Sequence, residues 1–406
     1  MSNNHIKSSF SDAEREALET LFPTPTEEIK DKSLETSEVS PQWTEEDDRF
    51  NSSIPFLISE DTEWIDTLYK AIYPLPVSKG HKYTFHNIIT NLSLRKTEIY
   101  LQLHKSSYKE THLPEDFVRT QVSKICDALE IRGYIKIKRG YKFAGSKGVA
   151  STVQPTEKLL SIMPDDMSYE IMEEGLVIPK DFSYETFPQS AIETRALLSE
   201  YNKTVEPENM LYASHKGGFE INGRFTGSSV CIMKKEDRKN ILIDGEPTVE
   251  LDISNCLPFL LYASELEDEL QGDAYEIKGI PRKLAKKAFM IAINNPTRAK
   301  ALSAIDRRIR FDYPDLSYNA SYILDQTEIN HSELVEEHLY KGLGLKLMYL
   351  EAQCMAKFMR SMLDKGIKFY PIYDSVRVPV SQRDIVEVEL KKAFTIGGIE
   401  PVIHED

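Results

Sequence analysis

The sequence predicts a protein of the α+β class, and three observations lead to this prediction. Apolar residues recur at helical spacing across residues 83–131, and short β-branched segments separated by turn residues follow them. From about residue 211 onward, strand-like and helix-like segments alternate. Residues 1–60, in contrast, are rich in Glu, Ser, Thr and Pro and show no sustained apolar period.

The composition is that of an ordinary globular chain. Of the 406 residues, 41% are apolar and 28% are charged, which allows two or three domains with cores of their own. No run approaches the length of a membrane-spanning helix, and the first residues lack the apolar stretch of a signal peptide. The four cysteines lie far apart without a CxxC pair, so neither a structural zinc site nor a disulfide framework is indicated. We therefore expect a cytoplasmic protein with no membrane partner.

Charge is distributed unevenly along the chain. The net charge is −15, but residues 1–60 hold 14 Asp and Glu against 5 Lys and Arg, and we interpret them as an acidic mobile arm. Residues 95–158 hold 13 basic against 7 acidic residues, and residues 282–310 hold 9 against one. Two concentrated basic zones in an acidic chain favour a polyanionic partner such as nucleic acid. Solvated helix faces are the alternative interpretation.

Residues 61–165 have the element order of a winged helix-turn-helix. A helix that begins at Pro114 carries apolar residues at helical spacing, and Gly133 ends it. Strand-like YIKIK, a turn at Arg139-Gly140 and two further strand-like segments follow. The segment resembles the C-terminal half of winged-helix domains, in which the last helix enters the DNA groove and the wing contacts phosphates. The resemblance implies that six residues contact nucleic acid: Arg119, Lys124, Lys138, Arg139, Lys142 and Lys147. Docking to a protein is the alternative role of such a domain.

Two acidic residues stand at the ends of predicted strands in the C-terminal part, residues 211–406, which follows a helical connector over 166–210. The segment TVELDI is typical of a strand that runs into an amphipathic helix, with Asp252 near its end and Ser254 after it. The segment KFYPIYDSVRVPV is typical of two strands joined at Asp374. Asp is common at helix N-caps and in turns, so neither residue is specific by itself.

Between these two strands lies a helix with a cationic stripe. Pro281 suits the first helical position, and Asn295-Pro296 ends the helix. Four residues share one face because they are spaced four apart, and these are Arg282, Lys286, Met290 and Asn294. Carboxylates hold divalent cations, and cations on a helix hold phosphates. A cationic stripe that faces two carboxylates is therefore a place for a nucleoside triphosphate.

The order of these segments resembles the palm and fingers of family A polymerases, a superfamily that includes the single-subunit phage-type RNA polymerases. Its first motif has an Asp at a strand end and a Ser two residues later, as at Asp252 and Ser254. Its fingers helix carries an Arg and a Lys four residues apart, as at Arg282 and Lys286 here. Four residues further on, the RNA polymerases have a Met, as at Met290. Its last motif, His-Asp followed by Glu or Ser, resembles the YDS segment around Asp374.

The resemblance covers roughly residues 215–395 and adds two residues to the expected nucleic-acid contacts. The stretch GRFTGSS resembles a family segment whose Arg contacts the primer–template minor groove, and the corresponding residue here is Arg224. The family also has a palm helix with a Gln that contacts the template, for which Gln353 is the nearest match. Taken together, the segments are similar to polymerase-like proteins of phages and mobile elements.

The chain departs from the family at four positions. Leu257 stands where DNA polymerases have a Glu beside the sugar, and Phe259 stands where an Arg follows. Asn294 replaces a Tyr that stacks under the base pair, and Tyr373 replaces the His before the last Asp. These differences concern base-pair checking and sugar selection, and neither metal ligand is among them. The expected substrate site consists of the four stripe residues together with three more, which are Ser254, Leu257 and Tyr373.

The resemblance implies a metal-dependent nucleotidyltransferase of phage or mobile-element type, in a bacterial or phage-infected cell. Asp252 and Asp374 would be the catalytic residues and would hold two Mg²⁺ or Mn²⁺ ions, while Arg282 and Lys286 would hold the triphosphate of an NTP or dNTP. The expected fold is a reduced right-hand polymerase palm with small helical fingers behind the winged helix, and nucleic acid is the expected partner. Two alternatives remain open. One is a DNA-binding replication or regulatory factor with an inactive palm, and the other is an unrelated α/β domain.

Overall fold

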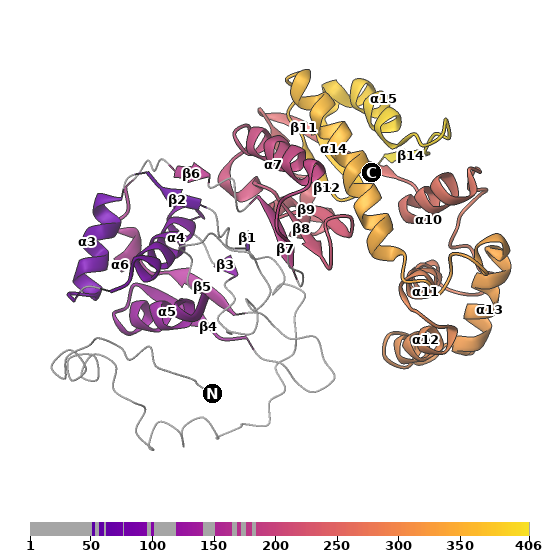
Figure 1. The fold of residues 1–406 in the computed structure, drawn as a ribbon, viewed down its shortest axis with the longest axis horizontal. Helices are drawn as coiled ribbons and strands as arrows, with labels where there is room; N and C mark the ends of the chain where they lie inside the picture. The colour runs from indigo at the N-terminus through magenta and orange to yellow at the C-terminus, as the bar shows by residue number, and fades with distance from the viewer. Residues whose placement is uncertain are drawn as a thin grey trace, which may run out of the picture. The chain divides into compact units, whose positions relative to one another are not determined.

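The computed structural model describes residues 51–52, 57–60, 62–75, 77–95, 99–100, 119–140, 151–164, 169–171, 176–180 and 184–405. All of them belong to the second of the two compact units into which the chain divides, Asp48–Asp406. Most of the predicted acidic arm, together with Lys142 and Lys147, lies outside the described residues. The α+β class is confirmed, because helices and several small sheets both contribute to the structure (Figure 1). Among the described helices, none is long and apolar enough to cross a membrane.

The N-terminal elements enclose a hydrophobic core of their own. Three helices contribute to it, α3 (Glu63–Ile72), α4 (Lys79–Arg95) and α5 (Val122–Ile131), and so do strands β4 (Ile135–Lys138) and β5 (Thr152–Pro155). Ile125 and Leu129 of α5 are fully buried because they are spaced four apart on one face. Gly133 ends this helix as predicted. Its φ is +75°, and the amide of Tyr134 then donates to the carbonyl of Leu129 at 3.0 Å. Strands β4 and β5 follow as an antiparallel pair.

Two sheets organise the C-terminal elements. In the larger one, strands β10 (Leu242–Ile243), β11 (Glu246–Ile253), β13 (Ser375–Pro379) and β12 (Tyr370–Ile372) lie in this order, and β14 (Ile403–Glu405) also pairs with β11. All of these pairs are antiparallel. The other sheet consists of β7 (Val177–Lys180), β8 (Tyr212–Lys216) and β9 (Asn222–Thr226). One continuous hydrophobic core joins both sheets to the helices around them.

Helices of two kinds surround these sheets. The long helix α14 (Gly344–Asp364), orange in Figure 1, packs against β9, against the short helix α10 (Cys256–Leu261) and against α15 (Arg383–Phe394). Three further helices, α11 (Arg282–Asn294), α12 (Arg298–Asp312) and α13 (Ala320–Asn330), pack on one another. Helix α7 (Gln189–Asn202) lies in the segment that we predicted to be a helical connector and also contacts α14. The division into domains at residues 165 and 210 stays a prediction.

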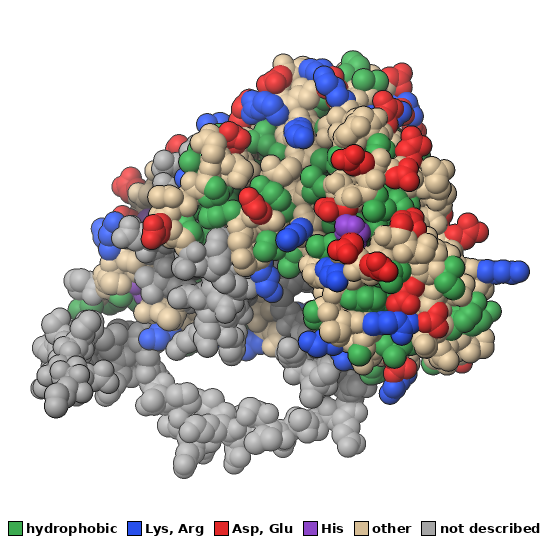
Figure 2. All heavy atoms as spheres, turned by 45° about the vertical axis from the view of Figure 1, so that its right-hand side comes forward, with side chains coloured by type: hydrophobic (Ala, Val, Ile, Leu, Met, Phe, Trp, Pro, Cys, Tyr) green, Lys and Arg blue, Asp and Glu red, His purple; other side chains and the backbone are tan. Residues whose placement is uncertain are grey.

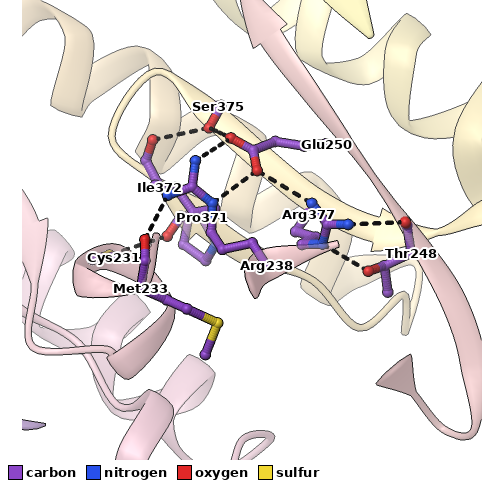
Figure 3. A network of polar contacts seen from close by, with 9 residues as sticks. All are labelled: Cys231, Met233, Arg238, Thr248, Glu250, Pro371, Ile372, Ser375 and Arg377. Atoms are coloured by element: carbon purple, nitrogen blue, oxygen red, sulfur yellow. Dashed lines mark hydrogen bonds and ion pairs between the residues drawn. The ribbon is translucent and has the colours of Figure 1, made fainter. Parts of the chain in front are cut away.

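A buried ionic network stabilises the pair of strands at the centre of the larger sheet (Figure 3). The Glu250 carboxylate on β11 accepts two hydrogen bonds from Arg238, at 2.8 and 2.9 Å, and one from Arg377 of β13, at 3.2 Å. Arg377 also donates to the side chain and the carbonyl of Thr248. Ser375 donates its hydroxyl to Glu250 at 3.1 Å. The network therefore fixes β11 against β13 through side chains as well as through the backbone ladder.

Candidate active site

Asp252 and Asp374 lie at the same end of two paired strands. In the register of β11 and β13, Asp252 is opposite Ser375, the residue after Asp374. The amide of Ile253 donates to the carbonyl of Asp374 at 3.1 Å. Tyr373, with φ +59°, forms the turn that leads from β12 to Asp374. Asp252 on β11 and Asp374, in the turn directly before β13, therefore lie on neighbouring segments of one antiparallel sheet.

Both aspartates line a cavity of about 570 Å³ together with the first two residues of the cationic stripe. Arg282 and Lys286 reach this cavity from the first two turns of α11, and Ser254 lies directly after β11. The other lining residues are Lys235, Ile253, Asn255, Cys256, Gly272, Asp273, Tyr275 and His404. Two carboxylates and two cations that the sequence separates by up to 122 positions therefore meet in one hollow.

Arg282 and Lys286, two of the three cationic residues that line the cavity, differ in their contacts. Arg282 donates to the carboxylate of Asp273 at 2.6 and 2.9 Å and to the side chain of Asn255 at 3.1 Å. Its hydrogen bonds lower the pKa of Asp273, which therefore stays ionised. Lys286 lies over the ring of Tyr275, with its Nζ 5.7 Å from the ring centroid, and its charge acts on Asp374 and lowers the pKa of that carboxyl. Lys286 is thus the cation of the cavity that acts on Asp374.

Glu351 is a functional candidate that the sequence analysis missed. It lies on α14, is 1% exposed and forms an ion pair with Arg224 of β9. Burial raises its pKa to about 7, against the opposing effect of Arg224, and the charges of Asp374 and Asp252 add to the increase. A usable signal was present in the sequence, because Glu351 stands four residues after Leu347 and four before Met355, both buried. An acid within such an apolar stripe indicates a buried charge with a partner.

Asp374 is half-buried at the wall of the cavity. Burial raises its pKa, whereas Arg224 and Lys286 lower it. One group of its neighbours could hold a metal ion, because ligand atoms of Asp374, Glu351 and Cys256 all lie within 4.8 Å of one another. Asp252 is outside that group but contributes to the electrostatics of Glu351 and lines the same cavity. The region offers the carboxylates of Asp252, Asp374 and Glu351, of which Glu351 is paired with Arg224, and such oxygen ligands suit a divalent cation.

The structure does not bring every predicted substrate contact to this cavity. Leu257 is 7% exposed and belongs to the hydrophobic core, and it does not line the cavity among the described residues. Met290 packs against the same core, and Asn294 is exposed, where its amide donates to the carbonyl of Met290 at 2.7 Å. The reason is geometric, because only the first two turns of α11 border the hollow. These three residues are therefore placed away from the position that the sequence analysis gave them.

The residues expected at nucleic acid are placed as follows. Arg224 is directed inward to Glu351 and lies over the ring of Tyr373, 5.3 Å from its centroid, instead of extending into solvent. Tyr373 itself is half-buried, and it does not line the cavity within the described part of the chain. Gln353 is half-buried on α14, two residues after the acid that meets Arg224. The side chain of Arg119 lies outside the described residues.

Ion pairs neutralise much of the second basic zone, residues 282–310. Lys287 and Arg308 both pair with Asp312, at 2.7 and 3.7 Å, and Arg310 pairs with Asp306. Arg298 pairs with two acids of α13. On the face drawn in Figure 2, acidic and basic side chains are accordingly interspersed. The net charge of a sequence window therefore overstated how much unpaired positive charge this zone presents.

Of the first basic zone, three predicted contacts lie within the described part with their side chains. Lys124 is exposed on α5, and Lys138 is exposed at the end of β4. Arg139 follows β4 and pairs with Asp127 at 2.8 Å and with Glu130 at 3.3 Å. Lys124 and Lys138 thus present positive charge near the β4–β5 hairpin, whereas two acids of α5 face the charge of Arg139.

No model of a known protein family matches the chain, and no curated protein matches it either. The chemistry of the cavity and the charge of the hairpin therefore carry the functional proposal.

Proposed function

We propose that this protein is a metal-dependent nucleotidyltransferase of the polymerase type, with nucleic acid and nucleoside triphosphates as its substrates. The observation that carries the proposal is the cavity in which Asp252 and Asp374 meet Arg282 and Lys286. Two divalent ions bound there, Mg²⁺ or Mn²⁺, would activate a 3′-hydroxyl and neutralise the leaving pyrophosphate. The proposed fold is a reduced palm built on β11 and β13, with α11 to α13 as small fingers and a winged helix around α5, β4 and β5.

The residues of the chain would position and neutralise charge. Asp252 and Asp374 would supply the oxygen ligands that hold the ions. Lys286 would bind the triphosphate, because it lines the same cavity and its positive charge interacts with Asp374 there. Arg282 would join it once a phosphate competes with Asp273 for its guanidinium. Positioning of the reacting groups and neutralisation of their charge are the main contributions that a protein makes to phosphoryl transfer.

The proposal is tested by nucleotide incorporation. The purified chain is incubated with Mg²⁺ or Mn²⁺, labelled NTPs or dNTPs, and primed or unprimed single strands. We expect a metal-dependent extension product with at least one combination. A folded protein that yields no product with either ion on any strand would instead support the second candidate function.

The second candidate is a DNA-binding replication or regulatory factor whose catalytic centre is inactive. One observation favours it, because Arg282 and Arg224 are both paired with acids of the chain itself. In that case the first basic zone would still bind DNA. The protein would incorporate no nucleotides, with or without substitutions in the cavity.

Lys286→Ala should raise the KM for the nucleotide by roughly tenfold or more while leaving the affinity for the nucleic-acid strand unchanged, since a charge-assisted phosphate contact is lost. Steady-state incorporation with varied nucleotide measures this. Lys287→Ala is the matched control, because the neighbouring Lys287 pairs with Asp312 and does not line the cavity within the described residues. Equal KM changes in the two variants would contradict the assignment of Lys286.

Charge reversal at Lys138 and Arg139 should weaken binding to duplex DNA uniformly across sequences and reduce its salt dependence, as the loss of phosphate contacts does. Fluorescence anisotropy over a series of salt concentrations measures both quantities. Lys70→Glu, at an exposed position on α3, is the control for a single charge reversal elsewhere and is compared with each single reversal at Lys138 and Arg139. An unchanged affinity and salt slope would identify the domain as a protein-docking module.

A further inference from the structure

Three side chains with metal-ligating atoms converge beneath the cavity from three different elements. Cys256 is the first residue of α10, Glu351 lies on α14, and Asp374 leads into β13. The Sγ atom and one oxygen of each carboxylate all lie within 4.8 Å of one another. Metal–oxygen and metal–sulfur bonds measure about 2.0–2.3 Å, so the three atoms are close enough for one ion to bind all of them after a small inward shift of the side chains.

Glu351 gives this cluster an unsatisfied ligand atom. The side chain is 1% exposed, and its Oε2 atom accepts the hydrogen bond of Arg224. Its Oε1 atom is buried and has no hydrogen-bond partner in the described part of the chain. Leaving a buried carboxylate oxygen without a partner is costly, so a cation that bound there would stabilise it. Arg224 neutralises one of the two carboxylates, and the remaining negative charge suits a cation.

An ion would reach the cluster from the cavity. Cys256 and Asp374 both line that cavity, whereas Glu351 lies behind them. Asn255, with φ +51°, turns the chain between β11 and α10 so that the Cys256 side chain borders the hollow. The thiol is therefore accessible to a small ion although it is 4% exposed to solvent.

We propose that Cys256, Glu351 and Asp374 form a binding site for a divalent transition-metal ion such as Co²⁺ or Zn²⁺, with a direct bond to the Cys256 sulfur. A thiolate is a soft ligand that these ions accept and that Mg²⁺ does not. Binding releases the thiol proton to solvent as the metal–sulfur bond forms. This inference rests on the proposed function insofar as the two sites share Asp374. The inference adds that this side of the cavity prefers a transition-metal ion to Mg²⁺.

Cobalt titration of the full-length protein tests the proposal. A Co²⁺–thiolate bond produces a charge-transfer absorption band in the near ultraviolet, which Co²⁺ bound by oxygen ligands alone does not give. We expect the band in the wild-type protein and its loss in Cys256→Ser. Cys354→Ser, which removes a second buried thiol on α14, should keep it. Glu351→Gln should keep the band but weaken cobalt binding by about tenfold or more.

A second measurement on the wild-type protein guards against a variant that does not fold. Alkylation of each cysteine is followed by mass spectrometry with and without Co²⁺. Over incubations long enough for the buried Cys256 to react, bound metal should slow its alkylation and leave that of the half-buried Cys231 unchanged. Absence of the band in folded wild-type protein, persistence of the band in folded Cys256→Ser, or unprotected Cys256 would each overturn the proposal.

These outcomes are distinguishable from failure of the proposed function. A thiolate band without nucleotide incorporation would support the metal site and reject the enzyme. Incorporation that Mg²⁺ supports equally in the wild type and in Cys256→Ser, with no cobalt band, would support the enzyme and reject the thiolate ligand.

Discussion

Asp252→Asn and Asp374→Asn should each reduce nucleotide incorporation on the order of a thousandfold or more, because each removes a charge that holds a metal ion in the cavity. Asn keeps the shape of the side chain, so the packing of β11 and β13 should not change. Burial raises the pKa of Asp374, which means that the folded protein stabilises its charged form poorly. The neutral Asp374→Asn variant should accordingly be as stable as the wild type or slightly more stable.

Three measurements separate this expectation from a loss of structure. Thermal unfolding reports stability, anisotropy reports strand binding, and incorporation reports chemistry. Of these three quantities, only nucleotide incorporation should fall. Asp364→Asn is a suitable control, since that exposed acid at the end of α14 lies outside the cavity lining. Incorporation close to the wild-type rate in either active-site variant would rule out the proposed role of that residue.

Glu250→Gln should destabilise the fold by about 3–5 kcal/mol, because it leaves two buried guanidinium groups without their counter-charge. The side chains of Arg238 and Arg377 are 13% and 3% exposed, so water cannot replace the lost carboxylate at Arg377. Burial already lowers the pKa of Arg377, a sign that its charge is held in an unfavourable environment that Glu250 offsets. The free energy of unfolding in urea measures the effect.

Glu246→Gln supplies the control for this second experiment. Glu246 is on the same strand and bonds to Ser381, but its contacts are exposed. Its replacement should cost less than about 1 kcal/mol. A similar small loss in Glu250→Gln would mean that the buried network contributes little to the stability of the strand pair.

Local sequence signals predicted a substantial part of the fold and of the candidate site. The alternation of β11 and the β12–β13 segment indicated where Asp252 and Asp374 lie, since strand ends can be recognised from apolar runs and turn residues. Helical spacing likewise placed Arg282 and Lys286 on one face. In both cases the decisive information lies within about ten residues of the side chain.

The parts that were not predicted depend on contacts between distant segments. Glu351 meets Arg224 across 127 positions, and His404 reaches the cavity through the pairing of β14 with β11. Leu257 was misplaced for a local reason that spacing does not reveal. Asn255 adopts a left-handed conformation, and after this turn Cys256 and Leu257 both pack in the core, while only Cys256 of the two also borders the cavity. Side-chain direction after such a residue cannot be read from a periodic pattern.

The pairing of β14 has a consequence for self-association of the protein. Leu251 and Asp252 are paired with β13 on one side, and the amide of Ile253 bonds to Asp374, the residue before β13. On the other side, these three residues are opposite Glu405, His404 and Ile403. Without β14, the backbone groups of β11 at the aspartate end would form an open edge, which is a template for pairing with a second molecule. The last strand of the described chain thus protects the segment that carries Asp252 from intermolecular β-pairing, and residues 403–405 are the part of this sheet where a deletion or a fused tag would promote aggregation.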